Sequence, residues 1–179
     1  MTINYNKKII LENGQEFYGF SFGYDEDKVC EIVFNTSMVG YQEILSDPSY
    51  TNQAVVMTYP LIGNYGLADD DYDFKRVFIN GYVVKENNDL PSNFRATRTL
   101  SDCMEENKVV GIEGLDTREI VKIIRDEGIM KAMICDENKP LEEVLVEADN
   151  LTTSFPSFKG AEIKETTKVL DSVEEKASF

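Results

Sequence analysis

One stretch of the chain, Glu31 to Gly66, constrains the fold more than any other. Its sequence is EIVFNTSMVGYQEILSDPSYTNQAVVMTYPLIGNYG. An apolar run at Glu31–Phe34 suits a strand, and a short helical pattern follows at Tyr41–Leu45. That helix must stop at Asp47-Pro48, because the residue before a proline avoids helical backbone angles. A second apolar run, Ala54–Tyr59, predicts a buried strand that leads into a glycine-rich loop.

Further elements are predicted on both sides of this stretch. Asn13-Gly14 lies between two β-rich runs, and Asn-Gly favours the positive φ angles of a tight hairpin turn. Thr99 and Asp116 are typical N-cap residues, and Glu119 gives the second helix a capping-box spacing. Gly128 is expected to end that helix in the left-handed conformation. The other predicted strands are Lys8–Leu11, Glu16–Phe22, Val77–Lys85 with a bulge at Gly81, Val109–Ile112 and Lys131–Cys135, and the other predicted helices are Leu100–Asn107 and one that begins at Pro140.

The order of these elements predicts the fold class and the domain boundary. Strands come first and mixed strands and helices follow, which favours an α+β or layered β/β/α domain with mixed sheets over a regular βαβ winding. The 179 residues suffice for one domain with a short appendage. Beyond Asn150 the sequence becomes polar, with one further strand expected near Ile163–Val169. We therefore expect a domain over residues 1–150 and a linker or tail over residues 151–179.

Charge and cysteine content exclude several classes of protein. The 33 acidic and 18 basic residues give a net charge of −15, which disfavours nucleic-acid binding because that binding needs Lys and Arg to displace counterions. No run approaches the roughly 20 apolar residues of a membrane span. The three cysteines, Cys30, Cys103 and Cys135, are odd in number and widely spaced, which argues against a disulfide framework and a zinc site. These features predict a cytoplasmic protein with reduced thiols.

The residue types also limit the chemistry. The chain has no histidine, which excludes Ser-His-Asp and Cys-His catalysis and any histidine metal ligand. Asp69–Asp73 resembles a calcium loop, but the required Gly and Glu positions hold Phe74 and Asn80. No phosphate-binding glycine motif occurs. We therefore predict no catalytic residue, no metal and no cofactor, although carboxylates or lysines leave acid–base chemistry open.

The Asp47–Tyr50 turn is the strongest candidate for a functional site. Pro48 fixes the backbone, Asp47 can close an Asx turn, and Ser49 would then present its hydroxyl at the tip. The alternative is a plain turn whose serine caps a local group. Asn64 and Gly66 form a second candidate loop, for which a structural role is the competing interpretation. The exposed face of the helix after Asp116 carries Arg118, Lys122 and Arg125, which fits a solvated face or a subunit contact.

The stretch from Glu31 to Gly66 resembles the amino-terminal domain of the small, glutamine-handling subunit of carbamoyl phosphate synthetase. The resemblance continues through SNFR (Ser92–Arg95) and GIEGLDTREIVKIIRDEG (Gly111–Gly128), and it covers roughly residues 8–135. It implies a layered, swivelling-type β/β/α architecture with mixed sheets. In this family a following amidotransferase domain carries a Cys-His-Glu set and hydrolyses glutamine. The ammonia passes to the large subunit, which makes carbamoyl phosphate from bicarbonate and ATP for pyrimidine and arginine synthesis.

No part of this chain matches that catalytic set. The resemblance therefore implies a catalytically silent domain that docks on the large subunit and forms one side of a glutamine cleft, beside a glutaminase domain that these residues do not include. It implies that Ser49 contacts glutamine, with supporting loop residues Asp47, Pro48, Tyr50, Asn64 and Gly66. Two alternatives remain open, namely a free-standing protein-interaction module and a small hydrolase that uses carboxylates and a metal at Asp69–Asp73.

Overall fold

The computed structural model describes residues 4–38, 40–64, 67, 77–89 and 98–144. Several predicted features lie outside these residues: the acidic run at 69–73, Gly66, the SNFR motif, the boundary near residue 150 and the strand expected at 163–169. The strands are β1 (Lys7–Leu11), β2 (Glu16–Gly23), β3 (Lys28–Asn35), β4 (Gln53–Met57), β5 (Leu61–Ile62), β6 (Gly81–Val83), β7 (Glu86–Asn87), β8 (Val110–Glu113) and β9 (Met130–Asp136). The helices are α1 (Tyr41–Ser46), the 3₁₀ turn η1 (Pro48–Tyr50), α2 (Leu100–Glu106) and α3 (Thr117–Glu127), and a further helix starts over residues 141–144.

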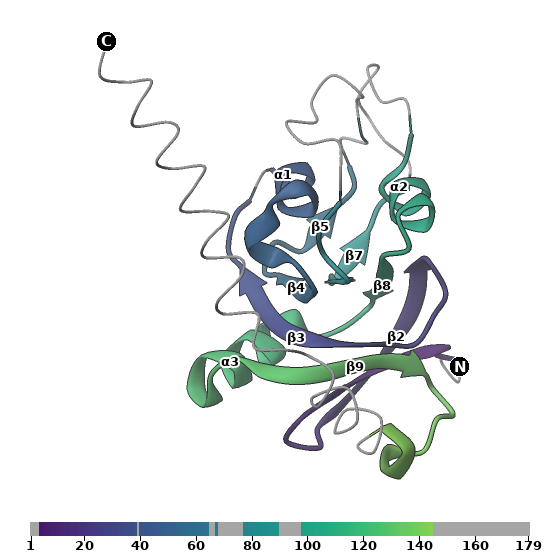
Figure 1. Cartoon of the computed structure of the whole chain (residues 1–179), viewed down its shortest axis with the longest axis vertical. Coiled ribbons are helices and arrows are strands. Elements are labelled where there is room, and N and C mark those ends of the chain that lie inside the picture. Colours follow the sequence, from purple (N-terminus) through teal and green to yellow (C-terminus); the bar gives the residue numbers. More distant parts are fainter. Residues whose placement is uncertain (1–3, 39, 65–66, 68–76, 90–97, 145–179) are drawn as a thin grey trace. The chain divides into compact units, whose positions relative to one another are not determined.

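The longer strands join into one closed barrel in the order β1-β2-β8-β6-β4-β3-β9 (Figure 1). Its sheet is mixed, because β3, β4, β6 and β8 pair in parallel while the pairings through β2, β1 and β9 are antiparallel. β9 closes the barrel by pairing with β1 on one side and with β3 on the other. The predicted α+β content with a mixed sheet is therefore confirmed.

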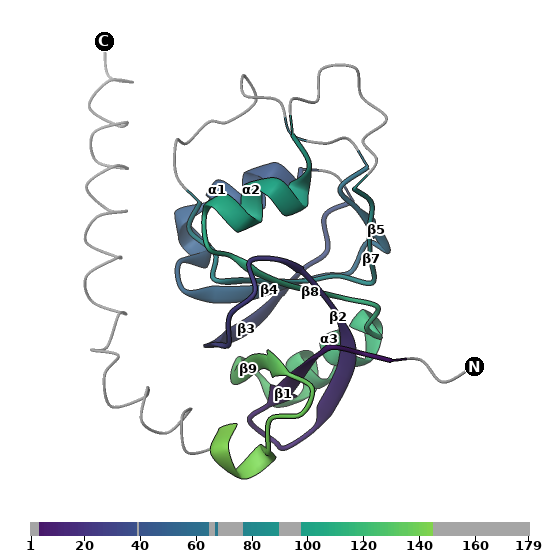
Figure 2. The same ribbon diagram turned by 90° about the vertical axis from the view of Figure 1, so that its right-hand side faces the viewer.

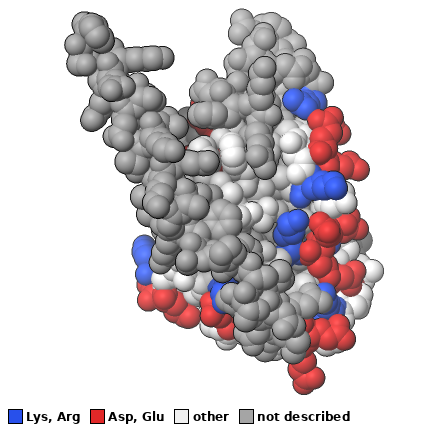
Figure 3. Space-filling view, in the orientation of Figure 1, with Lys and Arg blue, Asp and Glu red and all other residues white. Residues whose placement is uncertain are grey.

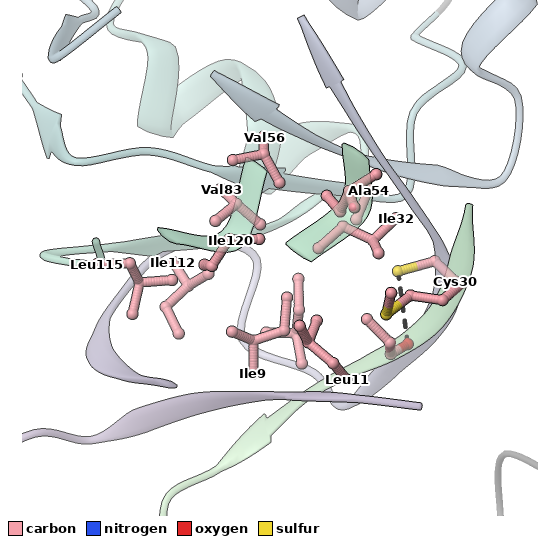
Figure 4. Close-up of a cluster of buried hydrophobic side chains, with 14 of the residues drawn as sticks. Ile9, Leu11, Cys30, Ile32, Ala54, Val56, Val83, Ile112, Leu115 and Ile120 are labelled. Carbon is pink, nitrogen blue, oxygen red and sulfur yellow. Dashed lines mark hydrogen bonds between the residues drawn. The ribbon is translucent and has the colours of Figure 1, made fainter. Parts of the chain in front are cut away.

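The interior of the barrel forms the first core. Alternate residues of the strands point inward, among them Ile9, Cys30 and Ile134, and all three are buried. α3 adds the apolar stripe that the sequence predicts, through Ile120, Ile123 and Ile124. Figure 4 shows part of this cluster, with the Cys30 thiol directed at the backbone carbonyl of Ala132, 3.9 Å from Sγ to O.

The second core lies on the outer face of β4 and β6, beneath α1 and α2. Figures 1 and 2 show these two helices on one side of the barrel and α3 on the other. α1 contributes Tyr41, Ile44 and Leu45, which pack with Val55 and Tyr82 from the sheet. The strand–helix–strand order that the first stretch of sequence predicts is present, and the structure adds that β3 and β4 pair in parallel, with the turn after α1 at the start of β4.

The first hairpin forms as predicted, but its turn differs. Gly14 has φ +84°, whereas Asn13 is not among the residues with positive φ. The Gly14 N–H donates to the Leu11 carbonyl at 2.8 Å, and the Leu11 N–H donates to the Gln15 carbonyl at 2.9 Å. This pattern is a three-residue loop with one left-handed glycine, which needs only one positive φ angle where a two-residue type I′ turn needs two. The prediction of a positive φ angle at Asn13 was therefore wrong.

The strand predicted at Val77–Lys85 is shorter than expected, because only Gly81–Val83 pair in the barrel. The preceding residues run beside α1 and β4 through single backbone bonds, such as Phe78 N–H to the Leu45 carbonyl at 2.9 Å. Gly81 is not a bulge, since it pairs in register with both Ala54 and Val110. A Cβ atom there would lie 3.0 Å from the Ala54 Cβ and 3.0 Å from the Ile134 Cδ1, so close packing explains the glycine.

Both predicted N-caps are present, but the end of α3 differs from the prediction. Thr99 and Asp102 form a reciprocal capping box at α2, and the Asp116 carboxylate accepts the Glu119 N–H at α3. The bond from Thr99 also holds the pKa of Asp102 below its ordinary value. Gly128 ends α3 with φ +93° but ψ −176°, so its backbone is extended beyond the helix and is not left-handed helical. Only glycine adopts that combination readily.

Candidate functional site

The turn between α1 and β4 carries Ser49 on an exposed 3₁₀ segment. Asp47 precedes it with an extended backbone, φ −78° and ψ 115°, as expected for a residue before proline. The Asp47 Oδ1 atom accepts the Ser49 N–H at 2.8 Å, and the Asp47 carbonyl accepts the Tyr50 N–H at 3.1 Å. The predicted Asx turn is therefore present, and it fixes the backbone on both sides of Ser49.

Within the described part of the chain, this arrangement leaves the Ser49 hydroxyl free. Ser49 and Pro48 are exposed, and within the described residues the Ser49 Oγ atom has no hydrogen-bond partner. The interpretation in which Ser49 caps a local group therefore has no support in the described part of the chain. A free hydroxyl on an ordered backbone can donate and accept one hydrogen bond each to a ligand.

Tyr50 holds the far end of the turn, because its hydroxyl accepts a hydrogen bond from Asn35. The Asn35 Nδ2 group donates to the Tyr50 hydroxyl at 3.0 Å, and its Oδ1 atom accepts the Ser37 N–H at 2.7 Å. The Asn35 carbonyl also accepts the Thr58 N–H at 3.1 Å. One residue at the end of β3 thus ties together the turn, the loop before α1 and the end of β4. Sequence reasoning did not single out Asn35, although an asparagine at a strand end is a common device for such local bonds.

The residues after Tyr50 stiffen the entry into β4. The Thr51 hydroxyl donates to the Pro48 carbonyl at 2.6 Å, which closes the turn on itself. Asn52 has φ +62° and its N–H donates to the Phe78 carbonyl at 3.3 Å. Asparagine tolerates this left-handed conformation better than most residues. The turn is therefore held at both ends by hydrogen bonds and by backbone geometry.

The second candidate loop lies on a separate two-stranded sheet. β5 pairs in parallel with β7, and Gly63 follows β5 with φ +87°. A Cβ at Gly63 would meet the Asn88 carbonyl at 2.7 Å, so a structural reason for that glycine is evident. Asn64 follows and is half-buried, while Gly66 lies outside the described residues. The grouping of Asn64 and Gly66 with the Ser49 turn stays a prediction.

The three cysteines are free and buried. Burial raises the pKa of Cys30 to about 12 and is the main cause that raises the pKa of Cys135 to about 11. A buried thiol with a raised pKa is a poor nucleophile, because the thiolate is the reactive form.

Surface charge in the described part of the chain is mixed. Figure 3 shows Lys and Arg side chains beside Asp and Glu side chains over one face. Lys7 and Lys8 are buried and pair with Asp25 at 2.6 Å and Glu16 at 3.5 Å. Arg118, Lys122 and Arg125 lie exposed on α3, as expected. Among the described residues, no group of three His, Cys, Asp or Glu side chains could hold a metal ion, and no helix is long and apolar enough to cross a membrane.

Comparison with known proteins places these features in a family. The model of the carbamoyl-phosphate synthase small chain, CPSase domain, matches residues 9–134. The chain belongs to this family. The match includes the whole β3–α1–η1–β4 unit with Ser49, both candidate loops and helices α2 and α3.

Relatives of the family are about half identical to this chain. The carbamoyl phosphate synthase small chains of Clostridium perfringens and Aquifex aeolicus are each 50% identical, over 137 and 143 residues respectively. These matches cover 76% and 80% of this chain but only 39% and 38% of the relatives. The pyrimidine-specific small chain of Bacillus subtilis is 45% identical over 139 residues, or 78% of this chain and 38% of that relative. The chain thus spans about two fifths of the length of the curated relatives it matches.

Proposed function

We propose that the chain is the amino-terminal domain of the small subunit of glutamine-hydrolysing carbamoyl phosphate synthase, and that it forms one side of a glutamine cleft. The family match over residues 9–134 supports this assignment. In this proposal a glutaminase domain supplies the catalytic groups, and the large subunit of the synthase is the docking partner. The layered, swivelling-type description of the barrel and a cytoplasmic location belong to the same proposal.

One observation in the structure carries the assignment of the cleft to the Ser49 turn. Ser49 is exposed, its backbone N–H is occupied by Asp47, and its hydroxyl has no partner within the described residues. A group that is ordered yet unsatisfied can bind a polar ligand without a further loss of backbone entropy. Glutamine carries a carboxylate, an ammonium group and an amide, each of which can exchange one hydrogen bond with a hydroxyl. The chain itself remains catalytically silent, and its contribution is to orient the substrate.

The decisive experiment compares two ammonia sources in the complete enzyme with Ser49→Ala. The rate of glutamine-dependent synthesis should fall because one hydrogen bond to the substrate is lost. Such a bond contributes about 0.5–1.5 kcal/mol with a neutral partner and about 1.5–3 kcal/mol with a charged one. That corresponds to a loss of several-fold to about a hundredfold. Ammonia-dependent synthesis should be unchanged, because free ammonia does not use the cleft. Ser21→Ala, in β2, is the control and should alter neither rate.

A loss of glutamine-dependent synthesis without a loss of ammonia-dependent synthesis would support the glutamine cleft. The other outcomes would contradict it. Equal losses in both reactions would assign Ser49 to structure or subunit docking. No loss in either would return the turn to a plain structural role. Failure of the chain to bind any synthase large subunit would favour the free-standing interaction module. A hydrolase that uses a metal at Asp69–Asp73 would be detected by metal titration, and that segment lies outside the described residues.

A further inference from the structure

The hydroxyl of Tyr82 is an anomaly in the core beneath the Ser49 turn. Tyr82 lies in the middle of β6 and is 0% exposed. Its hydroxyl oxygen is buried and has no hydrogen-bond partner among the described residues. Buried polar groups in proteins almost always have a partner, either protein or ordered water. Phenylalanine would fill the same space without this unsatisfied group, so the hydroxyl calls for a physical explanation.

The neighbours of Tyr82 suggest that explanation. Tyr82 pairs with Val55 in the sheet, and its side chain joins the cluster under α1 and α2. Tyr41, the first residue of α1, lies in that cluster, and Tyr50, the last residue of η1, packs against it. These two tyrosines bracket the segment that carries Ser49. Burial raises the pKa of Tyr82 well above its ordinary value, and the nearby phenols of Tyr41 and Tyr50 raise it further.

We propose that Tyr82 is a positioning residue, whose hydroxyl holds the Tyr50 end of the Ser49 turn through one internal water molecule. An internal water typically makes about three hydrogen bonds to buried polar groups, and the hydroxyls of Tyr50 and Tyr82 can supply two of them. The Tyr50 hydroxyl accepts a hydrogen bond from Asn35 and keeps its own proton to donate. The water would accept a hydrogen bond from the Tyr50 hydroxyl and donate one to the Tyr82 hydroxyl oxygen. The turn would then be fixed from the sheet below as well as from Asn35 at its side.

The first test uses the chain itself and does not depend on its function. In Tyr82→Phe, the N–H groups of Ser49 and Tyr50 should exchange with solvent about tenfold faster by NMR, while those of β4 stay unchanged. Tyr18→Phe, an exposed tyrosine on β2, is the matched control and should leave the turn unchanged. If the hydroxyl is merely unsatisfied, Tyr82→Phe should raise the melting temperature and leave exchange in the turn unaltered. That result would overturn the proposal.

A double-mutant cycle with Tyr50→Phe gives an independent measurement. If one water links the two phenols, removing either hydroxyl breaks the same link. The N–H groups of Ser49 and Tyr50 should then exchange no faster in the double variant than in Tyr50→Phe alone. Additive effects would show that the two hydroxyls act separately and would contradict the proposal. A crystal structure of the wild-type chain should show the water between both oxygens, and its absence there would be equally decisive.

The consequence for glutamine rests on the proposed function. In the complete enzyme, Tyr82→Phe should raise the KM for glutamine several-fold and leave ammonia-dependent synthesis unchanged. If the exchange test succeeds but the KM does not move, the positioning role stands and the glutamine role of the turn fails. If exchange and KM are both unaffected, the positioning role itself is wrong.

Discussion

Asp47 and Asn35 fix the backbone that presents Ser49, and both act through side-chain hydrogen bonds. Asp47 accepts the Ser49 N–H at 2.8 Å, and Asn35 donates to the Tyr50 hydroxyl at 3.0 Å. The Asp47 contribution could be predicted from the Asp-Pro-Ser order, because Asx turns are local. The Asn35 contribution could not, because it joins residues that only the β3–α1–β4 crossover brings together. The same limit applies to Tyr82, whose isolated hydroxyl depends on the packing of three separate elements.

At the residue scale, Asp47→Ala should destabilise the chain more than Ser49→Ala. Loss of an N-cap carboxylate costs about 1 kcal/mol, within a range of about 0.5–2 kcal/mol. Ser49→Ala removes an exposed hydroxyl with no partner in the described residues and should change stability by less than about 0.5 kcal/mol. Urea denaturation measures both values. Asp47→Asn keeps an acceptor at the same position and should recover most of the loss; a full loss in Asp47→Asn would mean that charge, not the cap, matters.

At the element scale, β2 and β8 approach so closely that only glycine fits between them. A Cβ at Gly19 would collide with the backbone carbonyl of Glu113, which cannot rotate away as a side chain can. The sequence gives no sign of this contact, because β2 and β8 are far apart along the chain. α3 is the opposite case, since its N-cap at Asp116 and its stripe of Ile120, Ile123 and Ile124 are local signals, and both were predicted. The closure of the barrel through β9 likewise could not be predicted, because pairing between distant strands leaves no local pattern.

Gly19→Ala should therefore destabilise the chain strongly. We expect a loss of about 3 kcal/mol or more, because overpacking against backbone exceeds the usual cost of about 1–3 kcal/mol for an added methyl group. Gly14→Ala is the informative control, since its Cβ would meet nothing within 4 Å while its φ is +84°. It should lose only the left-handed strain of about 1–2 kcal/mol. A loss in Gly19→Ala no larger than that in Gly14→Ala would show that β2 and β8 move apart enough to accept the added methyl group.

At the scale of the whole molecule, folding keeps the Cys30 thiol neutral inside the barrel. Burial raises its pKa from an ordinary value of 9.0 to about 12. A raised acid pKa gives stability that is fully present below pH 9 and is lost as the pH rises from 9 towards 12, because only the unfolded thiol then ionises. The slope for one thiol is about 1.4 kcal/mol per pH unit.

The stability of the wild type should fall more steeply with rising alkaline pH than the stability of Cys30→Val. Denaturation midpoints at pH 8, 9 and 10 should fall further for the wild type than for Cys30→Val as the pH rises, because valine fills much of the same space but cannot ionise. Cys135 is present in both proteins and cancels from the comparison. Parallel curves would mean that Cys30 reaches solvent at alkaline pH without global unfolding.

The same burial predicts that the three thiols of the isolated chain do not support glutamine hydrolysis. A cysteine glutaminase needs a thiolate and a base, and the chain has no histidine. With its pKa at about 12, Cys30 is ionised in only about one molecule in 10⁵ at pH 7. Cys135, at about 11, is little better, and all three thiols are buried. The purified chain should therefore release no ammonia from glutamine above the spontaneous rate. Release that disappears on replacing Cys30, Cys103 or Cys135 with serine would show that a buried thiol becomes exposed and activated, which would overturn both the silent-domain assignment and the description of this core as closed.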